Sequence, residues 1–198
     1  MKSNVCKIEN GTKDLDAILK ESNKVAEYNE LTHKQALQLR LICEEIDGML
    51  PNIIDDFSGD FWIEFEDGLC KVNVSIKIPE FNTDKKEKLI GIAKDKNNSA
   101  AVGISGKIRD AIENLFLNDT PTIGFVPTDG LFHLSTGFSE GVDYSYLWRL
   151  ENYKYSVKEE KTEEWDELER SVIASVADDV IVGVKGKRAD IIVVKRFA

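Results

Sequence analysis

The residues with the clearest chemical potential lie in a glycine-rich stretch near the middle of the chain, Gly103-Ile104-Ser105-Gly106-Lys107. Glycines and a lysine ahead of a helix are typical of phosphate-binding loops, because free N–H groups at a helix start attract anions. A complete Walker motif would need a glycine at Ala101 and a serine or threonine at Ile108. The stretch therefore predicts a plain helix start, and an anion site on its N–H groups is the alternative.

Two adjacent carboxylates, Glu44 and Glu45, lie in a segment with helical periodicity. Neighbouring residues of a helix point about 100° apart, so the pair cannot act as a facing acid and base. At most one of them is catalytic, and a solvated carboxylate is the alternative. The two histidines, His33 and His133, have no serine or cysteine partner at a spacing that indicates a catalytic triad.

The cysteine pattern gives no sign of a metal site or a disulfide framework. Cys6, Cys43 and Cys70 are widely spaced and form no CxxC pair. The chain has only two histidines to complete a zinc site. We therefore predict no metal ligands and a reducing compartment.

The charge balance argues against two classes of partner. The chain has 26 basic and 36 acidic side chains, for a formal charge of -10. This charge repels nucleic-acid phosphates and anionic lipids, so we expect neither nucleic acid nor membrane as a partner. No run of eighteen apolar residues and no apolar stretch behind the N-terminal charges is present, which predicts a cytoplasmic location.

A basic stretch near the C-terminus is the local exception to this acidity. It has a single acid, Asp190, among five basic residues. A solvated strand face is the first interpretation, and a small anion-binding face is the alternative. The five basic residues are Lys185, Lys187, Arg188, Lys195 and Arg196.

Helical periodicity predicts two consecutive helices that would carry the carboxylates. The first begins at Asp14 and places Leu15, Ile18 and Val25 on one face. The second begins at an N-cap, Thr32, with Gln35 in the capping-box position. We expect this second helix to end at Gly48 and Pro51.

Alternating apolar residues predict two hairpins. The first pairs the segment from Phe61 to Phe65 with the segment from Val72 to Ile78 across an Asp67-Gly68 turn. The second turns at residues 185–187. Its last strand, from Ile191 to Val194, is continuously apolar and therefore belongs inside a sheet.

The remaining segments complete the expected fold. We predict a short polar helix over residues 82–94, a polar loop over 94–99, a helix after Gly106 and another from Trp165 to Val176. Eight aromatic residues lie between 120 and 157, where we expect short strands whose aromatics fill the core or form a partner surface.

These elements predict an α+β protein, a two-layer α/β sandwich with a mixed or antiparallel sheet covered by helices on one face. We expect a single domain over residues 1–198, with an aromatic-rich β insertion at about 120–160.

The order of elements resembles the histidine-kinase-like (GHKL) ATPase fold, and particularly its anti-sigma-factor branch, except over residues 120–165. The resemblance implies that the helix from Leu39 to Ile46 carries the N-box. Glu45 would then be the base, and Met49 would occupy the position of the magnesium-binding asparagine. The loop from Asn97 to Gly106, which includes Asn98, resembles an ATP lid, and Lys107 would reach a phosphate. The implied nucleotide-binding set is Glu45, Met49, Asn98, Gly103, Ser105, Gly106 and Lys107.

Two departures from the family pattern change what the resemblance implies. The Met49 thioether cannot replace an amide oxygen as a ligand of magnesium. The family's adenine-binding Asp-x-Gly-x-Gly motif is replaced by Lys77-Ile78-Pro79-Glu80-Phe81. The chain therefore resembles a degenerate member of the family.

A degenerate member would be a non-catalytic regulatory or protein-interaction domain without a cofactor. It would bind a sigma factor or another regulator, and a homodimer is compatible with it. The alternative is an ATP-binding serine protein kinase or ATPase that uses ATP and magnesium with Glu45 as base. A third hypothesis is a small apolar ligand held by the sheet and the aromatic segment.

Overall fold

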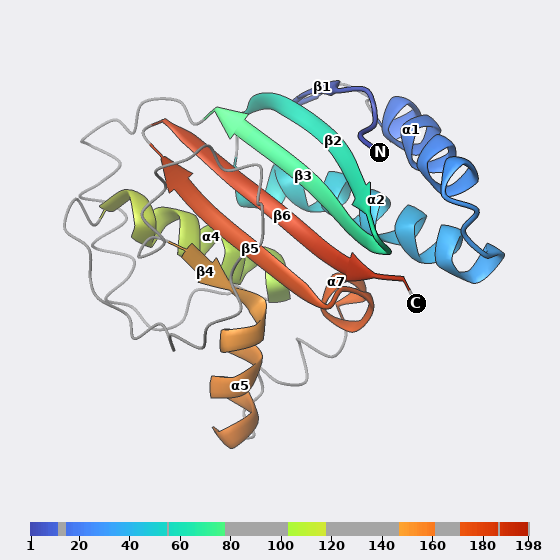
Figure 1. Cartoon of the computed structure of the whole chain (residues 1–198). Helices are drawn as coiled ribbons and strands as arrows, with labels where there is room; N and C mark the ends of the chain where they lie inside the picture. The colour runs from blue at the N-terminus through green and yellow to red at the C-terminus, as the bar shows by residue number, and fades with distance from the viewer. Residues whose placement is uncertain are drawn as a thin grey trace.

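A computed structural model describes residues 1–11, 15–54, 56–77, 103–117, 147–160, 171–185 and 187–197. These residues form an α+β fold, as the sequence predicts (Figure 1). In chain order the elements are β1 (Cys6–Glu9), α1 (Leu15–Tyr28), α2 (His33–Ile53), β2 (Ser58–Glu66), β3 (Leu69–Lys77), α4 (Gly103–Leu117), β4 (Leu147–Arg149), α5 (Leu150–Glu160), α7 (Val172–Val176), β5 (Asp179–Lys185) and β6 (Arg188–Arg196).

The strands form one antiparallel sheet in the order β1-β2-β3-β6-β5-β4. Both predicted hairpins are present, as β2–β3 and β5–β6. Asp67 and Gly68 both have positive φ, which is the backbone that a tight hairpin turn requires. The apolar strand β6 lies inside the sheet between β3 and β5, which confirms the expectation from its composition.

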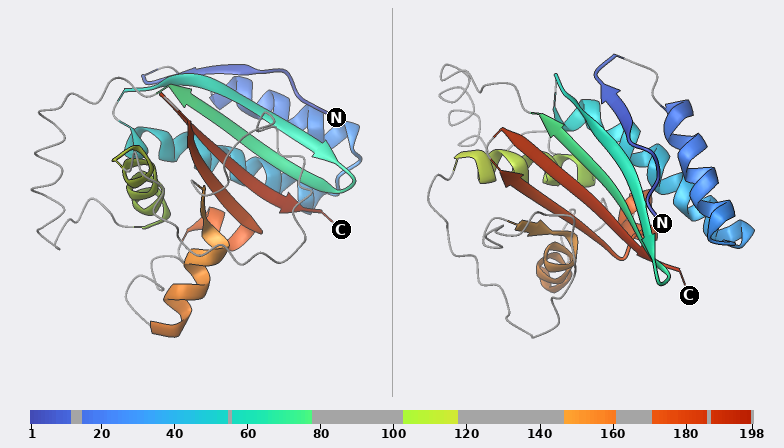
Figure 2. Two further views of the ribbon diagram at one scale, coloured as in Figure 1. Left: turned by 60° about the vertical axis from the view of Figure 1, so that its left-hand side comes forward. Right: turned by 45° about the horizontal axis from the view of Figure 1, so that its top comes forward.

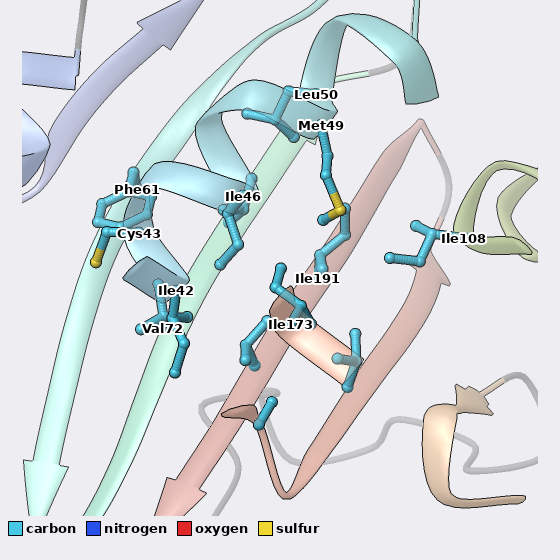
Figure 3. Packing of buried hydrophobic residues seen from close by; sticks show 14 of the residues in the cluster. Ile42, Cys43, Ile46, Met49, Leu50, Phe61, Val72, Ile108, Ile173 and Ile191 are labelled. Carbon is cyan, nitrogen blue, oxygen red and sulfur yellow. The ribbon is translucent and has the colours of Figure 1, made fainter. Parts of the chain in front are cut away.

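Helices α1, α2, α4 and α7 lie on one face of the sheet (Figures 1 and 2). Side chains of β2, β3 and β6 point toward this face and are apolar and buried, among them Phe61, Val72 and Ile191. They pack against Ile42 and Ile46 of α2 in one continuous core (Figure 3). The two-layer arrangement of the prediction is therefore confirmed.

Helix α2 begins as predicted and ends later than predicted. The Thr32 side chain accepts a hydrogen bond from the amide of Gln35, and the Gln35 side chain accepts one from the amide of Thr32, which completes a capping box. The helix continues through Pro51 to Ile53. Proline removes one hydrogen bond of the last turn, but Ile53 is buried in the core and the amide of Ile54 still donates to the carbonyl of Leu50, so the helix persists.

The predicted β insertion is described only in its last part. Residues 147–149 form strand β4, but residues 150–160 form helix α5 instead of a strand, which corrects the expectation for that stretch. Trp148 and Tyr153 pack together with their ring centroids 6.0 Å apart and contact the core. This contact favours a helix because it joins the strand to the first turns after it.

Several predicted segments lie outside the described residues. These are the polar helix over 82–94, the loop over 94–99, the aromatic residues before 147 and the start of the helix at Trp165. Of that last helix, the structure describes α7. Within the part of the chain that is described, none of the helices is both long and apolar enough to cross a membrane.

Two glycines provide a matched test of this packing. A Cβ at Gly59 would lie 2.3 Å from the carbonyl oxygen of Ser75, whereas a Cβ at Gly48 on α2 would meet no atom within 4 Å. We expect Gly59→Ala to destabilise the protein by about 1–3 kcal/mol, because the β2 and β3 backbones must separate. We expect Gly48→Ala to stabilise it by about 0.5–1 kcal/mol, because alanine favours the helix. Urea unfolding measures both, and equal effects would contradict the observed β2–β3 register.

Candidate functional site

The residues of the predicted nucleotide site lie on two helices that contact each other, α2 and α4. Glu45 and Met49 are one helical turn apart on α2, and α4 begins at Gly103 and contains Ser105, Gly106 and Lys107. The structure therefore brings the two segments together, as the resemblance implies. Asn98 lies outside the described residues.

Met49 is a core residue. Its side chain is 5% exposed and belongs to the same buried cluster as Ile46, Ile108 and Ile191. Figure 3 shows it extending from α2 toward the sheet, on the side of Ile108 and Ile191. A flexible thioether fills such an apolar space well, but these neighbours offer no oxygen ligands. The position that follows Glu45 by one turn therefore does not fit a magnesium ion.

The two adjacent carboxylates have different surroundings. Glu44 pairs with Arg40 one turn earlier, with 2.8 Å between its Oε1 and the arginine Nε. Glu45 is half-buried and forms no ion pair with any residue that the structure describes. The helix separates the two groups as expected, and Glu45 is the carboxylate that remains chemically available.

The thiol beside these carboxylates, Cys43, is fully buried. Burial raises the pKa of the Cys43 thiol to about 12, and the nearby charge of Glu44 acts in the same direction. Burial likewise raises the pKa of Cys70. Among the residues that are described, no group of three or more histidine, cysteine or acidic side chains could hold a metal ion.

The start of α4 packs into the core, and one of its side chains contacts α5. Ile104, Gly106 and Ile108 are buried. The ammonium group of Lys107 lies 5.4 Å from the ring centroid of Tyr153, within the range of a cation–π contact. Sequence reasoning did not find this contact, because Lys107 and Tyr153 are far apart in the chain and no motif connects them.

A second candidate site lies at one end of the sheet, where β1 and β3 end and β2 and β6 begin. A pocket of about 410 Å³ opens there, lined by residues that include Lys7, Glu9, Ser58, Asp60, Lys77 and Arg188. Arg188 donates to the hydroxyl of Ser75 through Nη2 at 2.8 Å and through Nε at 3.2 Å. The Ser75 hydroxyl in turn donates to Asp190.

Asp60 connects this network to the edge strand. One of its carboxylate oxygens binds the Lys7 ammonium group, and the other lies 3.8 Å from Nη2 of Arg188. The network therefore crosses β1, β2, β3 and β6 on the face opposite the helices. The basic C-terminal stretch predicts a charged strand face. Only the strand pairing shows that Arg188 lies beside Ser75 and Asp60, which are far from it in the sequence.

No model of a known protein family matches the chain, and no curated protein or solved structure is significantly similar to it. The resemblance to histidine-kinase-like ATPases therefore rests on the residues and element order given above.

Substitution of Met49 tests whether its surroundings are apolar. We expect Met49→Asn, which introduces the residue that the histidine-kinase-like ATPases have at the corresponding position, to be less stable than Met49→Leu by about 1–3 kcal/mol, because a buried amide would have no partner. Met49→Leu nearly conserves volume and should cost less than about 1.5 kcal/mol. Urea unfolding of both variants checks this. Equal stability would mean that water reaches the position, which contradicts the packed core.

Proposed function

We propose that this chain is a non-catalytic regulatory domain that binds a protein partner in the cytoplasm, on a scaffold similar to the histidine-kinase-like ATPases. An anti-sigma-like role, with a sigma factor or another regulator as partner, is the form of regulation that the resemblance favours. The protein would need no cofactor, and it could act as a homodimer.

The observation that carries this proposal is the burial of Met49. A nucleotide-binding relative would place an amide oxygen there for magnesium, whereas this chain has a thioether among isoleucines. Without this ligand the site would not hold a magnesium ion, whose positive charge neutralises the phosphates of a nucleotide. The same scaffold can then be retained for binding while its chemistry is lost.

Two further observations support a binding role. The ammonium group of Lys107, the candidate phosphate ligand, already makes a cation–π contact with the ring of Tyr153. Two tyrosines on the surface are each 73% exposed, Tyr28 at the end of α1 and Tyr155 on α5. Exposed tyrosines supply large contact areas at protein interfaces.

Calorimetric titration with ATP and magnesium tests the proposal. We expect no magnesium-dependent binding at micromolar ATP, because the metal position is apolar. The same titration without magnesium is the control. Micromolar affinity that disappears when magnesium is removed would contradict a non-catalytic domain.

The alternative, an ATP-dependent serine protein kinase or ATPase, is favoured by one observation: Glu45 is half-buried and unpaired among the described residues. If this alternative holds, Glu45→Gln should abolish phosphate release without changing stability. The matched control is Glu44→Gln, which should retain release because Glu44 pairs with Arg40 on the surface. Absence of phosphate release or transfer in the unmodified protein would eliminate the alternative.

A further inference from the structure

We propose that the pocket at the end of the sheet binds the phosphate group of a small molecule, with Arg188 and Lys77 as the main ligands. This site is independent of the proposed regulatory function. Asp60, Lys77 and Arg188 each neighbour a residue that is buried against the helices, so the pocket lies on the face of the sheet opposite α2 and α4. It uses none of the residues that the resemblance implicates.

The first argument is the arrangement of like charges. Lys77 on β3 is directly opposite Arg188 on β6. Like charges at opposite positions destabilise a sheet. Two other pairs of opposite positions on this face carry unlike charges, Lys7–Asp60 and Glu64–Lys71. Two cations at opposite positions, in a chain of charge -10, are therefore a local exception that a bound anion would stabilise.

The second argument is that Arg188 is held in position. Its Nε and Nη2 atoms both donate to the hydroxyl of Ser75, which is 5% exposed. Its Nη1 atom has no partner among the described residues, and 46% of its side chain is exposed. A planar guanidinium that is fixed along one edge and open along another can bind a phosphate oxygen with little loss of side-chain entropy.

The third argument concerns the charge of the ligand. The pocket contains three cations, Lys7, Lys77 and Arg188, and two carboxylates, Glu9 and Asp60, so its formal charge is +1. Lys7 binds Asp60 directly. The other charged groups of the pocket are Arg188 and Lys77, from opposite positions of neighbouring strands, and Glu9. With Glu9 included the net charge is +1, which attracts an anion, and the Arg188 fork and the Lys77 ammonium group can each contact an oxygen of a phosphate.

The size of the pocket indicates a small molecule. A volume of about 410 Å³ is within the range of small-ligand sites, roughly 300–1,000 Å³. The strongly acidic remainder of the chain repels extended polyanions, which excludes a nucleic-acid backbone as the source of the phosphate. Ser58, opposite Lys77, provides a hydroxyl for the rest of the ligand.

Amide NMR titration at constant ionic strength tests the site, with inorganic phosphate and glycerol 3-phosphate as probes and glycerol as the uncharged control. We expect both phosphates, but not glycerol, to shift the amides of Ser58, Lys77 and Arg188 in a saturable way. We expect Lys77→Gln and Arg188→Gln each to weaken binding roughly tenfold, because each removes one charged ligand.

Lys20→Gln is the matched control, because Lys20 is exposed on α1 and its loss changes the net charge equally. We expect less than about a twofold effect. Arg188→Lys keeps the positive charge but removes the planar guanidinium group, so we expect it to weaken phosphate binding several-fold. This variant still tests the site if Arg188→Gln does not fold. No saturable shift of these amides, or equal weakening by Lys20→Gln, would overturn the proposal, since binding would then reflect net charge or an adventitious ion only.

The same variants separate this site from the helix site. ATP also carries phosphates, so it could bind weakly at the sheet pocket. Binding that requires magnesium and persists in the Lys77→Gln, Arg188→Gln double variant belongs to the α2–α4 region and counts against the proposed function. Binding that is lost in the double variant supports the sheet pocket and leaves the proposed function intact.

Discussion

The packing of α2 along the inner face of the sheet determines where the other elements lie. Leu39, Ile42 and Ile46 repeat at helical spacing and are fully buried. Burial of each such side chain stabilises the fold by about 1.5–3 kcal/mol, so this stripe is among the largest stabilising contributions in the molecule. Helices α1, α4 and α7 all contact α2. A change in the position of α2 would therefore displace the whole helical layer.

This constraint divides the molecule chemically. The space between α2 and the sheet is occupied by apolar side chains, and Met49 completes that filling near α4. On the opposite face, Lys7, Asp60, Ser75 and Arg188 interact across four strands at one end of the sheet, beside a smaller apolar cluster of Ile181, Ile192 and Val194. Met49, at the position that the resemblance assigns to a metal ligand, thus lies in the apolar layer, and the polar pocket lies on the other face of the sheet.

The sequence predicted the local features well because they depend on neighbouring residues. The capping box of Thr32 and Gln35 and the turn at Asp67 and Gly68 are each specified within four residues. The extension of α2 through Pro51 was missed, because the burial of Ile53 against the core opposes the local preference of proline.

The candidate sites were less predictable because they depend on pairing between distant segments. The hydrogen bond between Ser75 and Asp190 joins residues 115 positions apart, and the β3–β6 register that places Lys77 opposite Arg188 has no local signature. The contact between Lys107 and Tyr153 requires a helix where the aromatic composition indicated strands. By contrast, the sequence alone shows that Met49 stands where the resemblance implies an asparagine. The structure adds that this side chain lies in the apolar core.

Oxidation of the two methionines by hydrogen peroxide, followed by peptide mass spectrometry, measures whether solvent reaches the space between α2 and the sheet. Met1 is 40% exposed and Met49 is 5% exposed, so Met1 is an internal control. Because Met49 is packed in the core, we expect Met1 to be oxidised readily in the folded protein and Met49 to be oxidised to the sulfoxide only after unfolding in urea. Oxidation of Met49 at the rate of Met1 in the folded protein would show an open, hydrated space beside α2 and would contradict a packed apolar core there.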